Sequence, residues 1–408
     1  MDLQTQDTGT AAETGPAPSL AAELQAPTVS RAYQCQCGRP IFLGNSRCLA
    51  CQTPLGYVID RLGVVPLAPS GQDQAEPDTF TVFGESQGRA YRRCANLTTP
   101  ASCNWMVPAP RDGDDPSFNT DGLVPGLCLA CSVTRTIPDL SVESNGELWR
   151  RLELAKRRLV SQLLALGLPV VTRIADPVHG LVFDFLSDSP GSPRVLTGHD
   201  EGVITLNAEE AEDAVRERIR AEMREPYRTL LGHFRHEIGH HYWDLLVLPT
   251  PWIDDYRKLF GDERADYAGA LQSYYASGPP PDWRDRYVTN YASSHSWEDW
   301  AETWAHYLHM ADTADTAMSF GVDAQNVELT GDLFDSGDLW QPEHPDAGRF
   351  LDFLNGWVRL TNVLNELSRS MGQPDFYPFV LPRLAVGKLQ FIHQVIAAQR
   401  EPKPFQPV

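Results

Sequence analysis

The sequence contains no run of about twenty apolar residues, which is the length that a helix needs to cross a bilayer. The start of the chain, Met1–Asp7, is polar and acidic, and it lacks the basic beginning and apolar centre of a signal peptide. We therefore expect a cytoplasmic protein that has no membrane partner.

Basic residues are few. The 408 residues include 34 Lys and Arg against 54 Asp and Glu, which gives a formal net charge of -20. A surface of this sign repels phosphate, so nucleic acid is not an expected partner. One basic run, at residues 150–151 and 156–158, lies in a Leu-rich amphipathic segment. We expect this run to form the solvated face of a helix.

Cysteine is absent after residue 131. The eight cysteines form two sets, each ending in C-x-x-C: Cys35, Cys37, Cys48, Cys51 and Cys94, Cys103, Cys128, Cys131. Close pairs joined by a loop are typical of a structural zinc site with four thiolates. Disulfides in a secreted protein are the alternative, but reduced thiols in the cytoplasm favour metal. The spacing leaves open which four thiolates share an ion.

The run His236-Glu237-Ile238-Gly239-His240 lies in a segment whose apolar residues recur with helical spacing. Positions i and i+4 of a helix share one face, so His236 and His240 can bind one zinc ion. Glu237 would then lie beside the metal, where it can accept a proton from water. Two histidines that only pack inside a buried helix are the alternative.

A third ligand must come from elsewhere in the chain. The metzincin pattern needs glycine at position 243 and histidine at position 246, where the chain has Trp243 and Leu246. A second helical segment carries Glu298 and Glu302 beside an apolar stripe. We expect Glu298 to bind the metal and Glu302 to hold a ligand imidazole. The reverse assignment stays open, and His295 is the fallback ligand.

These motifs resemble those of known families. The spacing Glu-x-x-Ala-Glu, with Tyr291 seven residues before Glu298, is similar to the zinc site of anthrax lethal factor and its relatives. This resemblance implies that Glu298 is the zinc ligand and that Tyr291 steadies the oxyanion of the reaction.

Over nearly its whole length the chain also resembles a bacterial family of zinc-binding metallopeptidases with an N-terminal zinc ribbon. The matching segments are Cys35–Phe42, Arg93–Asn96, Cys103–Trp105, Arg135–Leu140, His236–Trp243, Phe260–Arg264, Trp297–His309 and Phe376–Phe379. For the charged turn from Phe260 into the next helix, helix capping is the plain interpretation and support of the active site the alternative.

The composition predicts a disordered tail over residues 1–30, a zinc-ribbon module with two four-cysteine sites over 31–135, and a zincin-like domain over 136–408. We expect an α+β fold, mostly helical, with a small sheet built from strands at Pro169–Thr172, Leu181–Leu186 and Val203–Asn207. The last of these is expected at the sheet edge, where it either binds a peptide substrate by β-addition or is purely structural.

These patterns predict a zinc-dependent hydrolase that cleaves peptide bonds in a peptide or protein substrate, with one catalytic and two structural zinc ions. The main alternative is a catalytically silent adaptor that binds a protein partner through its zinc ribbon. A nucleic-acid-binding ribbon protein is the third possibility, and the acidic composition opposes it.

Overall fold

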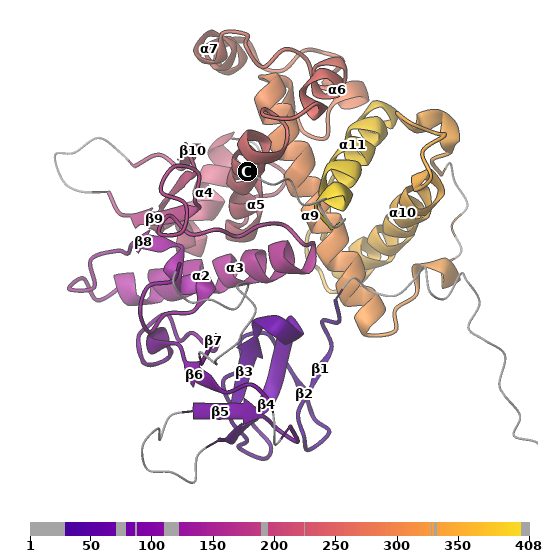
Figure 1. Ribbon diagram of the computed structural model, residues 1–408. Helices are drawn as coiled ribbons and strands as arrows, with labels where there is room; N and C mark the ends of the chain where they lie inside the picture. The colour runs from indigo at the N-terminus through magenta and orange to yellow at the C-terminus, as the bar shows by residue number, and fades with distance from the viewer. Residues whose placement is uncertain are drawn as a thin grey trace, which may run out of the picture.

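The computed structural model describes residues 29–70, 79–85, 88–109, 122–188, 195–223, 225–327, 329 and 333–400. The expected disordered tail therefore lies, except for its last two residues, outside the described part of the chain. The described chain is mostly helical with small sheets, and the antiparallel sheets of the cysteine-rich part lie apart from the helices (Figure 1), so the fold is α+β, as the sequence predicts. None of the helices in these ranges is long and apolar enough to span a membrane.

The cysteine-rich part of the chain forms small antiparallel sheets at one end of the molecule (Figure 1). Two short strands pair first: β1 (Tyr33–Gln34) and β2 (Pro40–Ile41). A five-stranded sheet follows in sequence order: β3 (Leu55–Val58), β4 (Gly63–Pro69), β5 (Thr79–Val82), β6 (Tyr91–Arg93) and β7 (Met106–Pro108). Its small core includes Tyr57 stacked on Trp105, with ring centroids 4.1 Å apart.

A third sheet has four strands in the order β10-β11-β9-β8: β8 (Thr134–Thr136), β9 (Val182–Leu186), β10 (Gly198–Asp200) and β11 (Val203–Asn207). Strands β8, β9 and β11 are parallel, and β10 runs antiparallel to β11. Because β8 begins at Thr134, this sheet reaches across the domain boundary that we expected after residue 135.

The expectation that Val203–Asn207 forms the sheet edge is wrong. A tight turn at Glu201 and Gly202, both with left-handed backbone (φ of 45° and 81°), folds β10 back along β11. Strand β10 is therefore the edge strand on this side of the sheet. The three residues of β10, Gly-His-Asp, have low strand propensity, which explains why the sequence did not reveal it. The strand expected at Pro169–Thr172 is reduced to one bridge between Thr172 and Leu181.

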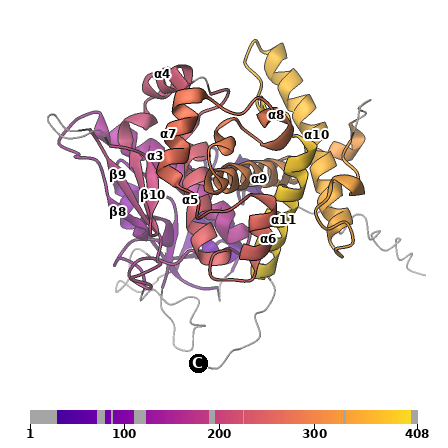
Figure 2. The same ribbon diagram turned by 90° about the horizontal axis from the view of Figure 1, so that it is seen from above.

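Helices make up most of the remaining chain. They are α2 (Leu129–Ser132), α3 (Asn145–Ala165), α4 (Asp213–Met223), α5 (Leu230–Leu246), α6 (Trp252–Leu259), α7 (Tyr267–Ser277), α8 (Trp283–Arg286), α9 (Ser296–Ser319), α10 (Ala347–Ser370) and α11 (Arg383–Arg400). Helix α9 lies in the middle and packs against both α5 and α11 (Figure 2).

Helices α5 and α9 cross at very short range because Gly239 has no side chain. A β-carbon at this position would lie 3.2 Å from the α-carbon of Ala301 and 3.3 Å from the β-carbon of Trp304. The indole Nε1 of Trp300 donates a hydrogen bond to the carbonyl of Gly239 at 2.8 Å. This crossing brings the start of α9 next to the His-Glu-x-x-His run on α5.

The basic run on α3 is a solvated face at Arg150 and Arg151, whose side chains are 44% and 36% exposed, but, contrary to our expectation, not at residues 156–158. Lys156 and Arg157 are buried, and their charged ends lie 2.8 Å and 3.7 Å from the carboxylate of Glu153. Arg158 pairs with Asp312 of α9 at 2.7 Å. The reason is that α3 lies between the cysteine-rich sheets and the helices around α9, so that neighbours cover both of its sides (Figure 1).

Candidate metal centres and active site

Three groups of metal-ligating side chains come together in the described residues. The first is Cys35, Cys37, Cys48 and Cys51; the second is Cys94, Cys103, Cys128 and Cys131; the third is His236, His240 and Glu298. Within each group the ligand atoms lie within 4.8 Å of one another. The structure thus groups the cysteines within their two sequence sets and not across them.

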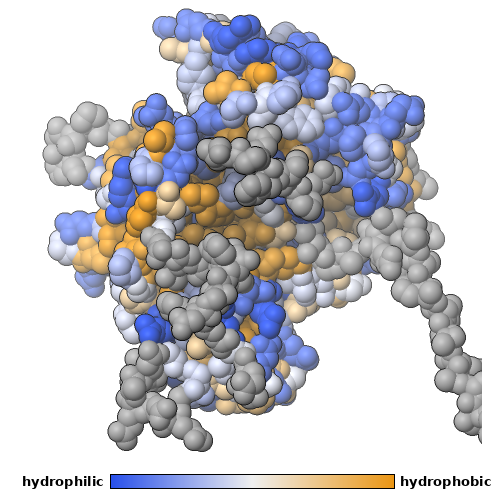
Figure 3. All heavy atoms as spheres, in the orientation of Figure 1, coloured by the Kyte–Doolittle hydropathy of each residue, from blue (hydrophilic) through white to orange (hydrophobic). Residues whose placement is uncertain are grey.

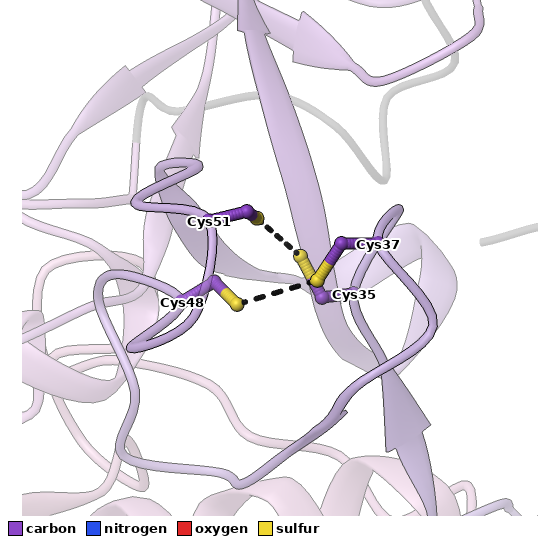
Figure 4. Close-up of side chains that lie close together, drawn as sticks. All are labelled: Cys35, Cys37, Cys48 and Cys51. Atoms are coloured by element: carbon purple, nitrogen blue, oxygen red, sulfur yellow. Dashed lines mark hydrogen bonds between the residues drawn. The ribbon is translucent and has the colours of Figure 1, made fainter.

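The first cysteine group is formed by the loop after β1 and by the next tight loop, which point their sulfurs at one another (Figure 4). Sγ of Cys35 lies 3.6 Å from that of Cys51, and Sγ of Cys37 lies 3.7 Å from that of Cys48. Four sulfurs bound at about 2.3 Å around a tetrahedral ion stand about 3.8 Å apart. A disulfide needs about 2.05 Å, and none of the eight cysteines forms one.

Local hydrogen bonds suit Cys51 of this group to a metal. The hydroxyl and backbone N–H of Thr53 lower the pKa of Cys51 to about 6. A thiol with a lowered pKa is readily present as the thiolate, which is the form that binds zinc.

The second cysteine group lies deeper in the molecule. All four of its side chains are buried, whereas Cys37 and Cys51 of the first group are exposed. Sγ of Cys103 lies 3.7 Å from that of Cys128, and the backbone N–H of Cys128 donates to Sγ of Cys94 at 3.4 Å. Cys128 and Cys131 flank the start of α2, next to α3. This group therefore lies where the cysteine-rich module meets the rest of the chain.

The third group combines two histidines of α5 with a glutamate from the first turn of α9. Nε2 of His236 lies 3.1 Å from Oε2 of Glu298, and Nε2 of His240 lies 3.7 Å from Oε1 of Glu298. The two imidazole rings are 5.0 Å apart. All three side chains thus turn their ligand atoms toward one point between the helices.

Glu302 lies one turn further along α9, outside this group. Its Oε1 is 2.7 Å from Nδ1 of His236, the nitrogen that faces away from Glu298. Its Oε2 accepts a hydrogen bond from Thr289 at 2.7 Å. Glu302 therefore contacts the Nδ1 side of the His236 ring and is not among the atoms that converge between the helices.

His295, the fallback ligand, is also outside the group. Its Nδ1 accepts the backbone N–H of Trp297 at 3.1 Å, which makes it the N-cap of α9, and its Nε2 lies 3.3 Å from the carbonyl of Ala265. One ring nitrogen thus caps the helix that carries Glu298, and the other contacts the loop before α7.

Glu237 and Tyr291 lie beside the group. Glu237 is buried on α5, and burial raises the pKa of its carboxyl. Tyr291 begins a short 3-10 turn before α9, and its ring lies 6.0 Å from that of His236. Burial, followed by the charge of Glu298, raises the pKa of Tyr291, so the phenol keeps its proton and is a hydrogen-bond donor.

Further residues of the site carried no clear sequence signal. The hydroxyl of Tyr267, at the start of α7, donates to Oε1 of Glu298 at 2.6 Å. The indole of Trp297 lies 3.9 Å from the ring of His240, and His199 of β10 lies 6.2 Å from it. Tyr267 and His199 come from α7 and β10, so spacing along the chain could not have joined them to the motif, whereas Trp297 directly precedes Glu298 on α9.

The chemistry of the third group fits a zinc ion. Glu298 is almost fully buried, and the contact of its Oε2 with Nε2 of His236 at 3.1 Å is not aligned as a hydrogen bond. A buried carboxylate needs a compensating positive charge. Two imidazoles with one carboxylate are also the protein ligands of many catalytic zinc sites, which keep one position open for water or substrate.

Comparisons with known proteins agree with both kinds of site. Residues 145–395 match the family described as "Putative zinc-binding metallo-peptidase", and residues 32–142 match a zinc-ribbon domain. Two uncharacterized proteins, from Mycobacterium tuberculosis and Mycobacterium bovis, are each 40% identical to this chain over 368 residues, which covers 90% of this chain and 95% of theirs. No solved structure matches. The chain belongs to the zinc-binding metallopeptidase family and carries an N-terminal zinc ribbon.

Proposed function

We propose that this protein is an endopeptidase that hydrolyses peptide bonds at the group formed by His236, His240 and Glu298. One observation carries the proposal: the acid Glu237 is buried directly beside three converging zinc ligands. An ion bound only for structure needs no buried acid at its side that is not itself a ligand. Motif, geometry and family membership all support the same class of reaction.

Each side chain has a distinct role in this proposal. His236 and His240 bind zinc through Nε2, and Glu298 supplies the third protein ligand. Glu302 accepts a hydrogen bond from Nδ1 of His236 and so fixes the tautomer that leaves Nε2 free for the metal. Thr289 holds Glu302 in turn.

When bound, zinc makes water nucleophilic at neutral pH and polarises the scissile carbonyl. Glu237 accepts a proton from the attacking water and delivers it to the leaving nitrogen. Tyr291 donates a hydrogen bond to the tetrahedral oxyanion. This role for Tyr291 rests on the likeness of the motif to the lethal factor site, and the proximity of its ring to His236 supports it.

An extended peptide is the form of substrate that the sheet favours. Among the described strands, β10 pairs only with β11, so its outer edge is available for β-addition. His199 of β10 lies near His240, so a peptide paired with β10 would pass the metal centre.

The two cysteine groups complete the proposal with two structural zinc ions, for a total of three per chain, in a protein that acts in the cytoplasm. The loops around the first group carry two exposed apolar side chains, Phe42 at 60% and Leu49 at 87%. Exposed apolar residues on a small module favour contact with a protein partner. The adaptor function is therefore the second candidate, and it would operate without Glu237.

The test of the proposal is the variant Glu237→Gln. It should keep all bound zinc, because Glu237 is not a ligand, and it should lose about 10²- to 10⁴-fold in hydrolysis of an unstructured protein substrate. Glu222→Gln on α4, an exposed acid outside the converging group, is the matched control and should stay active. Unchanged hydrolysis, or loss of zinc, in Glu237→Gln would refute the mechanism.

A further inference from the structure

Helix α7 has an unusual position in the molecule. None of its residues, Tyr267–Ser277, is buried, although it lies beside the metal centre. Glycines with left-handed backbone stand near both of its ends, Gly261 with φ of 106° and Gly278 with φ of 77°. The region where α6 and α7 lie is mostly hydrophilic on the face that Figure 3 shows. A helix of this length that buries so little is only marginally stable by itself, so specific contacts must hold it.

Those contacts come from two tyrosines on one face of the helix. The hydroxyl of Tyr267 donates to Glu298 at 2.6 Å, and the Tyr267 ring packs edge-on against His295 at 5.2 Å and Trp297 at 5.8 Å. Two turns later, the ring of Tyr274 packs edge-on against Tyr291 at 5.8 Å. Every one of these partners belongs to the start of α9 or to the turn before it. Helix α7 is thus attached to the metal centre itself.

The bond from Tyr267 has a direct consequence for the ligand. The terminal torsion of a glutamate side chain is broad, so the backbone of α9 alone does not decide which carboxylate oxygen faces the metal. A hydrogen bond donated to Oε1 fixes the plane of the carboxylate and leaves Oε2 facing Nε2 of His236. A hydroxyl bound to a carboxylate at this distance makes a strong, charge-assisted bond.

We propose that Tyr267 is a positioning residue that holds Glu298 in the orientation that binds zinc, and that this bond couples the seating of α7 to occupation of the metal centre. The inference rests on the proposed function for the assignment of Glu298 as a ligand. Two of the three ligands are then oriented from behind, His236 by Glu302 and Glu298 by Tyr267. Because coupling is reciprocal, zinc stabilises α7 and α7 strengthens zinc binding.

The first test compares Tyr267→Phe with Tyr275→Phe. Phenylalanine keeps the ring that packs on His295 and Trp297 and removes only the hydroxyl. Tyr275 lies on the same helix, is 61% exposed and serves as the control. Zinc is titrated against a coloured chelator, with the double variant His236→Ala/His240→Ala as the baseline for the cysteine sites. We expect zinc to bind about 10- to 100-fold more weakly in Tyr267→Phe and within about twofold of wild type in Tyr275→Phe.

The second test follows α7 directly by hydrogen exchange of the full chain with and without zinc at the third site. In the wild type, zinc should slow exchange in residues 267–277. In Tyr267→Phe this zinc-dependent protection should be lost, while the circular dichroism spectrum stays that of the wild type.

Equal zinc affinity in Tyr267→Phe and wild type would overturn the inference, as would exchange in α7 that does not respond to zinc. Unchanged affinity with slower hydrolysis would also overturn it and would assign the hydroxyl to the substrate instead. The titration needs no substrate. If the wild type binds zinc at the third site but hydrolyses nothing, the proposed function is rejected. The role of Tyr267 is then still decided by the zinc titration.

Discussion

The two parts of this molecule use metal-binding residues in different ways. In the ribbon module the strands are short, and six of the eight cysteines belong to the buried cluster itself, together with Tyr57 and Trp105. In the metallopeptidase domain a large continuous core, with Phe234, Trp300 and Trp304 among its members, forms without the ligands of the third site. Metal-ligating residues therefore form part of the buried core in the ribbon module, whereas in the metallopeptidase domain they lie beside a core that is complete without them.

The cysteine groups and the third group also differ in the number and kind of their ligands. Each cysteine group offers four thiolates, which close a tetrahedral site. The third group offers three side chains, the number that catalytic zinc sites use when they keep one position for a reactant. Stability and chemistry should therefore respond separately when each site is changed.

The largest expected effect is at the second cysteine group. Cys128→Ser removes a fully buried ligand next to α3, and a structural zinc site contributes about 10 to 16 kcal/mol to folding. We expect the ribbon strands to lose their structure while α5 and α9 stay folded. Hydrogen exchange resolved by segment measures both. Loss of protection in α5 and α9 as well would show that the two parts fold as one unit, which would contradict the view that each has its own core.

The second-largest effect is expected at the ion-pair cluster that links the two parts. Asp312 of α9 is 4% exposed and faces three arginines: Arg31 at the start of the ribbon at 3.2 Å, Arg158 of α3 at 2.7 Å and Arg235 of α5 at 2.8 Å. Asp312→Ala leaves these buried charges uncompensated, so the free energy of unfolding should fall by about 3 to 5 kcal/mol. Chemical denaturation measures this change, with the exposed Asp352→Ala as the control. A fall of less than about 1 kcal/mol would mean that the cluster does not join the two parts.

The smallest effect separates the two glutamates of α9. Glu298→Ala removes a ligand and should abolish zinc binding at the third site. Glu302→Ala removes only the partner of His236 and should weaken binding by about 10- to 100-fold. Neither variant should change the melting of the metal-free core. Competition with a chelator measures the zinc affinity of both variants. Stronger zinc retention in Glu298→Ala than in Glu302→Ala would exchange the two roles.

Local patterns in the sequence predicted the features that depend on local geometry. The helical spacing of His236 and His240 and the C-x-x-C pairs need only neighbouring residues, and the structure places each of these sets together. The α+β class and the family membership were predicted for the same reason. Glu298 could be named as a candidate because it lies beside an apolar helical stripe one turn from Glu302, although its contact with α5 depends on the close crossing at Gly239.

Features that depend on tertiary packing were not predicted. Charge patterning assigned Lys156 and Arg157 to a solvated face, because a sequence does not show that a second module covers the helix. Strand β10 was missed because its pairing with β11 arises from a turn and not from apolar alternation. Tyr267 meets Glu298 only after α7 folds back onto α9, and the turn before it gave no more than a hint of support for the site.

The zinc content of the purified full chain under reducing conditions tests the central claim most directly. We expect three zinc ions per chain in the wild type and in Glu237→Gln, and two in His236→Ala/His240→Ala, with the core of the metallopeptidase domain still folded. Two or fewer ions in the wild type, or the same count in the wild type and the double histidine variant, would contradict the division into two structural sites and one catalytic site.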